Sequence, residues 1–368
     1  MSDYQHTYGH QRLHEPFLFL YITEKCQLRC QHCYMGERLD RERRMSPDHV
    51  QGLLRYLKTV HGQYKVYILG GEPTTHPDLP AILDVCREAG FQVVVTSNGL
   101  IPERVWPHLT TSRIQSLSFS MDGASTSTHE HMRGRGTYRR LIDSIERAVS
   151  AGFQTRAIFT VTTENQHEVE DAIELGERFG LDMMSFHYFT PTGLGKDKPH
   201  FQLPPAAWRE VCSRLDTAAA MAGISVFYPP GFATSVELAV LTTDHSYPGC
   251  TARNLERLAI FPDGRVYICS MFFDTDEHYG IFNGTEIVPR IPEHDGARGG
   301  ELRLVNSLSR NCIGCGMAAG CKGGCAAYDF FGTTLTSSGC TRELAPICPL
   351  WSRPAGTTRP PASLQDLR

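Results

Sequence analysis

The chain has 368 residues, of which 41% are hydrophobic, enough to bury the core of one large domain or two. Its 36 basic and 40 acidic residues give a net charge of −4, and no basic stretch interleaved with aromatic residues is present, which argues against a nucleic-acid partner. The first residues lack the basic start and apolar core of a secretory signal, and the apolar run FLFLYI (17–22) is too short to cross a bilayer. These features predict a soluble, cytoplasmic protein without a membrane partner.

Strand-like and helix-like patterns alternate from residue 17 onward. Runs rich in β-branched and aromatic residues predict six strands, at 17–23, 65–70, 92–97, 115–120, 155–161 and 183–189. Apolar residues at helical spacing predict helices at 46–60, 78–90, 137–152, 167–180 and about 205–222. Six successive βα units favour a parallel sheet with helices outside, open or barrel-like, whose functional residues lie at the carboxyl ends of the strands.

The pattern changes after this first domain, which we place at residues 15–225. Residues 226–249 are rich in Pro, Gly and Thr and are interpreted as a linker. ERLAIFPDGRVYICS then predicts a β-hairpin that turns at PDG. The remainder of residues 250–350 is rich in Cys and Gly, so we expect it to fold around metal. The tail, 352–368, is predicted to be disordered.

Thirteen cysteines are unusual in a chain without an export signal, and in a reducing compartment clustered cysteines are more often metal ligands than disulfides. Cys26, Cys30 and Cys33 follow the first predicted strand in the spacing C-x3-C-x2-C. Three thiolates can hold three irons of a [4Fe–4S] cluster and leave the fourth iron open to an external ligand. A zinc site is the alternative, but such sites usually contain two CxxC-type pairs, and no fourth cysteine is near.

This cysteine motif resembles that of the radical S-adenosylmethionine (SAM) superfamily, and motifs at later strand ends strengthen the resemblance. GGEP (70–73) ends the second predicted strand, SNG (97–99) the third and SMDG (120–123) the fourth. The resemblance implies an α/β fold with a partial (β/α)6 TIM-like barrel, which binds a [4Fe–4S] cluster and SAM. It also implies reductive cleavage of SAM to a 5′-deoxyadenosyl radical that abstracts a substrate hydrogen.

The resemblance also assigns roles around SAM. GGEP would bind the amino group of the methionine moiety, Ser120 and Asp122 the ribose, and Arg133 the carboxylate. The implied SAM-binding residues are Gly70, Gly71, Glu72, Pro73, Ser97, Asn98, Ser120, Asp122, Arg133 and Asn165.

The later cysteines resemble the SPASM extension of the same superfamily, a seven-cysteine pattern that holds two auxiliary [4Fe–4S] clusters. The family pairing assigns Cys250, Cys269 and Cys325 to the first auxiliary cluster. The second takes Cys312, Cys315, Cys321 and a last cysteine, for which Cys348 is favoured over Cys340. Three [4Fe–4S] clusters correspond to about 12 irons per chain. Zinc ribbons are the alternative.

Two departures from the SPASM pattern bear on function. Fully ligated relatives carry an extra cysteine where this chain has LTTDHSYPG (241–249), so the first auxiliary cluster has either an open iron or a ligand among Asp244, His245 and Cys340. Ser270 stands where anaerobic sulfatase maturases place an acidic base. This argues against sulfatase maturation, although the acidic residues 274 and 276 are near enough to substitute.

Auxiliary clusters suit reactions that remove a second electron after hydrogen abstraction, such as dehydrogenation, crosslinking or decarboxylation. SPASM enzymes most often act on ribosomally made peptides, the leading substrate class. Only 25 residues precede Cys26, so either a separate leader-peptide-binding protein exists or the substrate is a small molecule. The alternative is a small-molecule dehydrogenase or epimerase acting on aminoglycoside or aminocyclitol sugars, with Cys340 as candidate hydrogen donor. Either reaction needs a reductant such as flavodoxin or ferredoxin.

Overall fold

The computed structural model describes residues 16–60, 65–234, 236–238, 252, 257–273, 275–290, 325, 327, 344–347 and 353–354. Six parallel strands follow one another in chain order: β1 (Phe17–Thr23), β2 (Lys65–Gly70), β3 (Gln92–Ser97), β4 (Ser116–Ser120), β5 (Gln154–Val161) and β6 (Met183–Tyr188). They confirm the predicted α/β fold class. β7 (Ser225–Tyr228) adds a further parallel strand beside β6.

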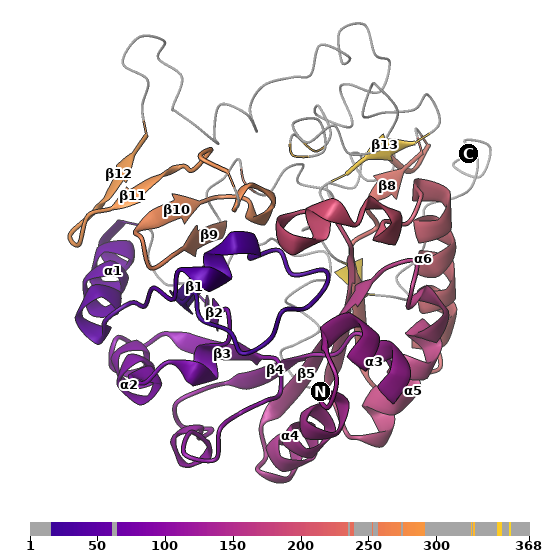
Figure 1. Ribbon diagram of the computed structural model, residues 1–368, viewed down its shortest axis with the longest axis horizontal. Coiled ribbons are helices and arrows are strands. Elements are labelled where there is room, and N and C mark those ends of the chain that lie inside the picture. Colours follow the sequence, from indigo (N-terminus) through magenta and orange to yellow (C-terminus); the bar gives the residue numbers. More distant parts are fainter. Residues whose placement is uncertain are drawn as a thin grey trace, which may run out of the picture.

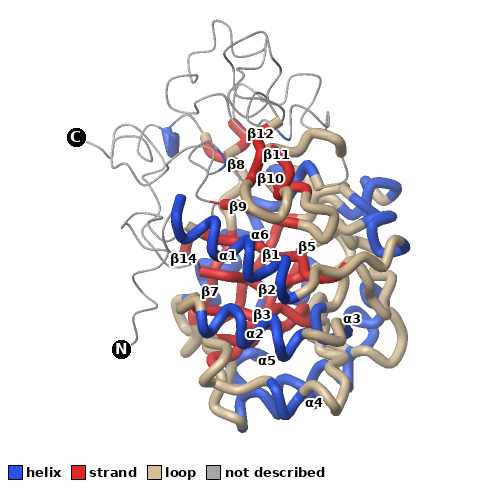
Figure 2. Tube along the Cα trace, turned by 90° about the vertical axis from the view of Figure 1, so that its left-hand side faces the viewer, coloured by secondary structure: helices blue, strands red, loops and turns tan. Residues whose placement is uncertain are grey.

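Helices cover the outer face of the curved sheet (Figures 1 and 2). The five predicted helices are α1 (Pro47–Val60), α2 (Leu79–Glu88), α4 (Tyr138–Ser150), α5 (Val169–Arg178) and α6 (Pro205–Ala219). A sixth, α3 (Thr126–Arg133), escaped prediction because its sequence, TSTHEHMR, is polar and buries only His129 and Met132. Short 3-10 helices are η2 (Gly36–Asp40), η3 (Pro73–Thr75), η4 (Trp106–His108), η5 (Gln166–Glu168), η6 (Gly193–Asp197), η7 (Pro199–Phe201) and η9 (Ser270–Phe272).

The predicted hairpin is present and extends the barrel sheet. β9 (Arg257–Ile260) lies parallel to β1 and antiparallel to β10 (Arg265–Tyr267). The hairpin turns at Gly264, which has φ +78 and could not carry a Cβ without meeting the carbonyl oxygen of Phe282 at 2.7 Å. The other strands are β11 (Gly280–Phe282) and β12 (Ile287–Pro289), then β8 (Phe232–Ala233) paired with β13 (Ala345–Pro346), and β14 (Arg353–Pro354) paired with β7.

Alternation along β1 shows how the sheet separates the core from the barrel interior. Leu18 and Leu20 are fully buried in the hydrophobic core. Phe17, Phe19 and Tyr21 line an internal cavity, as period-two side-chain geometry requires. No helix among the described residues is long and apolar enough to span a membrane.

Candidate functional site

A cavity of about 400 Å³ occupies the barrel interior. Most of the predicted SAM-site residues meet there, although they come from five separate segments of the chain. The predicted residues in its wall are Cys26, Cys30, Cys33, Gly70, Gly71, Glu72, Ser97, Asn98, Ser120 and Arg133. The lining does not include Pro73, Asp122 or Asn165, which are buried beside it.

The cysteine loop packs directly against the GGEP segment. The amide of Gly71 donates to the carbonyl of Thr23 at 2.8 Å, and the amide of Glu72 donates to the carbonyl of Lys25 at 2.9 Å. A Cβ on Gly71 would lie 2.4 Å from the Lys25 carbonyl oxygen, so no larger residue fits without displacing the backbone. Gly70 meets the Thr23 carbonyl oxygen in the same way, at 2.5 Å. The two glycines therefore fix where the cysteine loop begins.

Cys30 is buried, and Cys26 and Cys33 are half-buried. Burial raises the pKa of Cys26 to about 11 and that of Cys33 to about 12, and it also raises the pKa of Cys30. Donors lie near two of the sulfurs: Asn98 Nδ2 is 3.7 Å from Cys26 Sγ, and Arg133 Nη1 is 3.9 Å from Cys30 Sγ. Such thiols lose their protons when a metal binds them.

The donor set fits an iron–sulfur cluster better than a single ion. Within the described part of the chain, no three His, Cys, Asp or Glu side chains converge closely enough to hold one metal ion. A [4Fe–4S] cluster takes each thiolate on a different iron and does not require such convergence.

Glu72 is held rigidly at the end of β2. Its Oε1 accepts hydrogen bonds from the Thr74 amide (3.1 Å), the Thr74 hydroxyl (2.6 Å) and the Ser97 hydroxyl (3.0 Å). Its Oε2 accepts from the Asn98 amide at 2.7 Å. Burial raises the pKa of Glu72, although these donors oppose the shift. Glu72 thus ties the GGEP motif to the SNG motif.

Asp122 anchors two residues around the cavity. Its Oδ2 accepts a hydrogen bond from Arg133 Nε and lies 3.0 Å from His32 Nε2, and its Oδ1 accepts from the Thr160 amide at 2.7 Å. Burial alone would raise the pKa of Asp122, but Arg133 and His32 outweigh it and hold that pKa far below its usual range. Asp122 is fully buried and orients the Arg133 side chain, which does line the cavity.

Asn165 supports this arrangement from the loop after β5. Its Nδ2 donates to the carbonyl oxygens of Asp122 (3.1 Å) and Thr160 (2.9 Å), while its Oδ1 accepts from the Thr162 amide at 2.7 Å. Asn165 is fully buried, so in this structure its side chain braces the ends of β4 and β5.

Sequence reasoning missed the basic residues of the cavity wall: Arg156 on β5, His187 on β6 and Arg257 on β9. Hydroxyl side chains accompany them, at Thr96, Ser118, Thr160 and Ser185. Period-two alternation contained the signal, because Arg156 and His187 occupy inward-facing positions of β5 and β6.

Only two of the cysteines assigned to auxiliary clusters can be placed. Cys269 follows β10 and is buried, and its neighbours Ile268, Ser270 and Met271 line the cavity. Cys325 is buried as well. The others, Cys250, Cys312, Cys315, Cys321, Cys340 and Cys348, lie outside the described residues, as do Asp244, His245 and Asp274.

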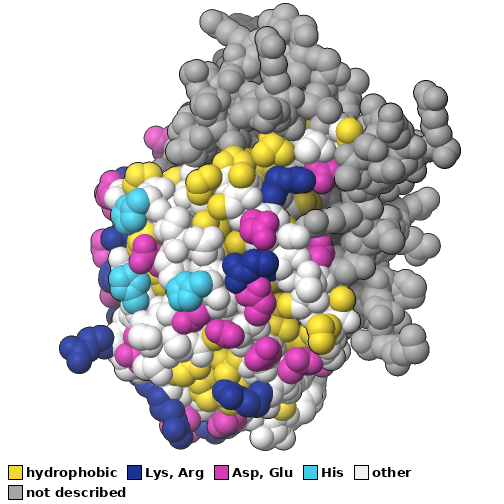
Figure 3. Space-filling model, turned by 90° about the vertical axis from the view of Figure 1, so that its right-hand side faces the viewer, with side chains coloured by type: hydrophobic (Ala, Val, Ile, Leu, Met, Phe, Trp, Pro, Cys, Tyr) yellow, Lys and Arg dark blue, Asp and Glu magenta, His cyan; other side chains and the backbone are white. Residues whose placement is uncertain are grey.

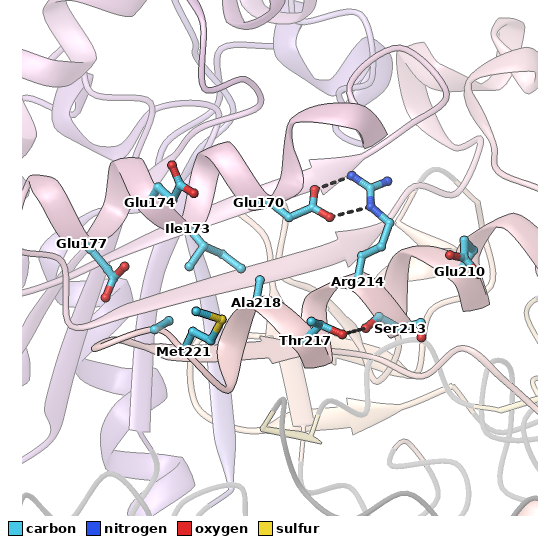
Figure 4. Close-up of a pocket in the computed structure, with 11 residues that line it drawn as sticks. Glu170, Ile173, Glu174, Glu177, Glu210, Ser213, Arg214, Thr217, Ala218 and Met221 are labelled. Carbon is cyan, nitrogen blue, oxygen red and sulfur yellow. Dashed lines mark hydrogen bonds and ion pairs between the residues drawn. The ribbon is translucent and has the colours of Figure 1, made fainter.

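A second hollow, of about 570 Å³, lies on the outside of the barrel between α5 and α6 (Figure 4). Glu170 pairs with Arg214 at its edge, and Glu174, Glu177 and Glu210 surround it. The face shown in Figure 3 carries such acidic side chains between apolar patches. None of the predicted site residues lines this hollow, so the internal cavity is the candidate active site.

Comparisons with known sequences identify a family whose model matches the part of the chain that forms most of the cavity wall. Residues 20–176 match the family model of the radical SAM superfamily. The AdoMet-dependent heme synthase of Methanosarcina barkeri is 29% identical over 200 residues, which cover 52% of this chain and 54% of that protein. The match thus spans about half the length of that relative. The mycofactocin maturase MftC of Mycolicibacterium smegmatis is 27% identical over 317 residues, 84% of this chain and 78% of the maturase.

Solved structures share the fold. SuiB of Streptococcus suis bound to S-adenosylmethionine superposes with a TM-score of 0.66 at 19% identity, covering 86% of this chain and 74% of SuiB. Native anSMEcpe with bound AdoMet gives a TM-score of 0.62 at 17% identity, covering 87% and 92%. With its CxxxCxxC loop beside GGEP in one barrel cavity, the segment that matches the family model, residues 20–176, is a radical SAM domain.

Proposed function

We propose that this protein is a radical SAM enzyme of the SPASM type that oxidises a ribosomally synthesised peptide. The observation that carries the proposal is the shared cavity, in which the three cysteines, Glu72 and Arg133 face one space. A passive electron carrier has no use for a SAM site, which the GGEP and SMDG motifs indicate. The family match implies a [4Fe–4S] cluster and SAM as cofactors.

Each residue of the site has a proposed role in binding the cluster or SAM. Cys26, Cys30 and Cys33 would hold the cluster, which together with SAM would supply a carbon radical able to take hydrogen from an unactivated C–H bond. Glu72 would accept the ammonium group of SAM, and Arg133 would bind its carboxylate. Ser120, in the cavity wall, would bind the ribose, whereas Asp122 would act through Arg133, which its carboxylate orients. A location inside the barrel would limit the access of water to the reactive intermediate.

The proposal includes two auxiliary clusters in a SPASM region at residues 250–350, joined by a linker (226–249) to the barrel (15–225). Burial of Cys269 and Cys325 supports it, as does the position of Cys269 beside cavity-lining residues. A cluster there would lie near enough to accept the second electron of a substrate oxidation. We assign Cys348 as the last ligand in preference to Cys340, and place the enzyme in the reducing cytoplasm.

A peptide substrate is supported by two of the similar proteins. One relative is named as a mycofactocin maturase, and SuiB has been solved with its precursor peptide SuiA. We propose that a separate protein presents the leader of the peptide and that a flavodoxin or ferredoxin supplies the electron. Sulfatase maturation is disfavoured: Ser270 is in the wall, while Asp276 is 84% exposed and pairs with Arg265.

A small-molecule substrate is the second candidate function. The hydroxyl side chains of the wall favour it, since they suit a polar, sugar-like ligand. A relative named as a probable GTP 3′,8-cyclase, 28% identical over 178 residues, supports it too.

Substrate trials with the reconstituted enzyme decide between these two. The genes beside this one provide the candidates: a short open reading frame with a small leader-binding protein, or sugar-tailoring enzymes. We expect the peptide from such a frame to lose two hydrogens, detected by mass spectrometry, only when SAM and reductant are both present. An unchanged peptide together with an oxidised aminocyclitol would replace the first candidate with the second.

A further inference from the structure

Two tyrosine hydroxyls meet in the wall of the internal cavity. Tyr21 lies near the end of β1 and Tyr34 directly follows Cys33, and their hydroxyl oxygens are 3.1 Å apart. Both residues line the cavity. Their rings meet edge to face, with 6.3 Å between the centroids. This tyrosine pair, Tyr21 and Tyr34, therefore joins the end of the first strand to the end of the cysteine loop.

The surrounding contacts hold the tyrosine pair in place. The Tyr21 ring stacks on that of Phe261, with 4.2 Å between the centroids. The Phe273 ring lies 5.2 Å from that of Tyr21 and 5.9 Å from that of Tyr34. A Cβ on Gly193 would come 2.5 Å from the Tyr34 carbonyl carbon, so the backbone of η6 packs directly on this segment. Because a tyrosine side chain has only two rotatable bonds that place its ring, these contacts leave the hydroxyls little freedom.

The tyrosine pair has one hydroxyl hydrogen more than its internal bond uses. A neutral phenol carries one O–H donor, and the bond between Tyr21 and Tyr34 takes one of the two. Among the residues that the structure describes, neither hydroxyl has another hydrogen-bond partner. Tyr21 is 3% exposed and Tyr34 is 38% exposed, so the Tyr21 hydrogen fits the internal bond and the Tyr34 hydrogen remains accessible. A donor in this position favours a ligand that carries an acceptor.

The tyrosine pair lies on the side of β1 away from the proposed SAM contacts. In the sheet, β9 neighbours β1 on one side, and β2, β3 and β4 follow on the other (Figure 1). Residues proposed to contact SAM stand at the ends of β2, β3 and β4, whereas Tyr21 stacks on Phe261, which directly follows β9. Tyr34 meets Phe273, on the segment that follows Cys269. The accessible hydroxyl is therefore better placed for the substrate than for SAM.

The neighbours of the tyrosine pair suit an uncharged acceptor. Met35, Met271 and Phe273 line the same cavity as the two tyrosines. Burying a charged group among such side chains costs more than burying a neutral polar group that is hydrogen-bonded. An amide carbonyl, which recurs along a peptide, is an acceptor of this kind.

We propose that the tyrosine pair binds the substrate: the Tyr34 hydroxyl donates a hydrogen bond to an amide carbonyl of the substrate and accepts one from Tyr21. Tyr34 is then a binding residue, and Tyr21 is a positioning residue that acts through it. Hydrogen bonds in such a chain strengthen one another. Because Tyr34 directly follows Cys33, the bond fixes which part of the substrate faces the cysteine loop. This inference rests on the proposed function and deepens it, since it names a group that holds the peptide.

Two probes that differ in one acceptor atom test this bond. N-methyl-2-phenylacetamide and its thioamide have nearly the same shape, but sulfur is a weaker acceptor than oxygen. Equilibrium dialysis against the anaerobically reconstituted full chain, with SAM present, measures the binding of each. We expect the amide to bind roughly tenfold more tightly than the thioamide.

Tyrosine variants locate the preference. Tyr34→Phe removes only the donor hydroxyl and should abolish the preference for the amide. Tyr21→Phe leaves the Tyr34 hydroxyl without its support and should reduce the preference. Tyr56→Phe is the matched control, because Tyr56 lies on α1 and does not line the cavity, and it should keep the full preference. Iron content and circular dichroism check that each variant is folded.

Infrared spectroscopy detects the same bond without relying on affinity. The carbonyl of the amide probe is labelled with ¹³C, and its stretch should lie at lower frequency in the unmutated protein and in Tyr56→Phe than in Tyr34→Phe, because a hydrogen bond weakens the C=O bond. Equal binding of the amide and the thioamide, competition of the amide with SAM, or a preference that survives Tyr34→Phe would each overturn the proposal.

A further probe separates a peptide carbonyl from the hydroxyl groups of a small substrate. 2-Deoxystreptamine carries hydroxyl groups but no carbonyl. If Tyr34→Phe weakens its binding and leaves that of the amide unchanged, the pair holds a sugar-type hydroxyl and the amide assignment is wrong. SAM cleavage is measured on the same samples: an unmutated protein that forms 5′-deoxyadenosine without preferring the amide contradicts the role of the tyrosine pair alone and leaves the proposed function standing.

Discussion

Arg38 and Asp263 form a buried ion pair, 3.2 Å long, that joins the segment after the cysteine loop to the turn of the β9–β10 hairpin. The Arg38 side chain is 2% exposed, and its guanidinium also meets the Glu24 carboxylate at 3.1 Å and the Tyr267 hydroxyl at 2.8 Å. η2 follows the cysteine loop, and Cys269 follows β10. The pair therefore sets the position of one cysteine-bearing segment against the other.

Replacement of Arg38 should lower the stability of the fold. Arg38→Met leaves the Glu24 and Asp263 carboxylates without their buried partner, and we expect the free energy of unfolding to fall by about 3–5 kcal/mol. Arg43 provides the matched control, because it approaches the same carboxylates at 4.0 and 3.3 Å but is 47% exposed. Arg43→Met should cost less than ~1 kcal/mol. Urea unfolding measures both, and equal losses would show that the buried pair is not the anchor.

A methyl group on Gly71 should disturb cluster assembly. Its Cβ would lie 2.4 Å from the Lys25 carbonyl oxygen, so Gly71→Ala must push the cysteine loop away from GGEP. We expect the iron content of the reconstituted variant to fall by about one cluster, four irons. Gly223→Ala is the control, since the Cβ there meets only the end of the Glu177 side chain. Full iron content in Gly71→Ala would contradict the proposed contact between the two motifs.

Glu168 positions α3, the helix that ends at Arg133. Its carboxylate accepts hydrogen bonds from the Ala124 amide (2.7 Å) and from the hydroxyls of Ser125 (2.7 Å) and Thr128 (2.6 Å). Burial would raise the pKa of Glu168, but these donors outweigh it and lower the pKa below its ordinary value. A carboxyl with a lowered pKa stabilises the fold above its unfolded-state pKa, and that contribution is lost as the pH falls.

Glu168→Gln should therefore cost about 1–3 kcal/mol at neutral pH, with the gap to the wild type narrowing below about pH 4. Urea unfolding at pH 7 and in mild acid measures the gap at each pH. Glu103→Gln, in which an 83% exposed carboxylate beside Arg147 is neutralised, should show neither effect. A gap that stays constant with pH would mean that the Glu168 charge does not hold α3.

Replacing Cys30, in the cysteine loop, should lower the iron content of the protein, whereas replacing Cys86, in the hydrophobic core, should not. Cys30→Ala removes a cluster ligand, and we expect about eight of about 12 irons to remain, with the auxiliary clusters intact. Cys86→Ala leaves all of them, because Cys86 is fully buried in the hydrophobic core and serves packing. Iron analysis alongside visible absorption measures both. About four irons per chain in the unmutated protein would contradict the proposal of two auxiliary clusters.

Much of the fold follows from local pattern. The bounds of β1, β2 and β3 agree with the predicted ranges residue for residue, because each is an uninterrupted β-type run between turn signals. α3 shows the limit of that reasoning: tertiary hydrogen bonds to Glu168 define it rather than an apolar stripe. The pairing of β9 with β1 could not be predicted either, since no local pattern specifies a partner more than 200 residues distant.

Some residues of the candidate site could likewise be predicted from the sequence, and others could not. The resemblance to the radical SAM superfamily, carried by the cysteine motif and by motifs at strand ends, indicated the cysteines, Glu72 and Arg133. The sequence alone could not show that Asp122 turns its carboxylate to Arg133 and His32 instead of to the cavity, since that depends on side-chain direction. Arg257 was missed for a topological reason: it enters the cavity through the unexpected β9–β1 pairing.

SAM cleavage is the most direct test of the central claim that the cysteine loop and GGEP form one SAM site. The anaerobically reconstituted protein is mixed with SAM and dithionite, and 5′-deoxyadenosine and methionine are quantified by chromatography. We expect both products from the unmutated protein and from Cys86→Ala, and neither from Cys30→Ala. No 5′-deoxyadenosine from the unmutated protein with its clusters intact would contradict the account.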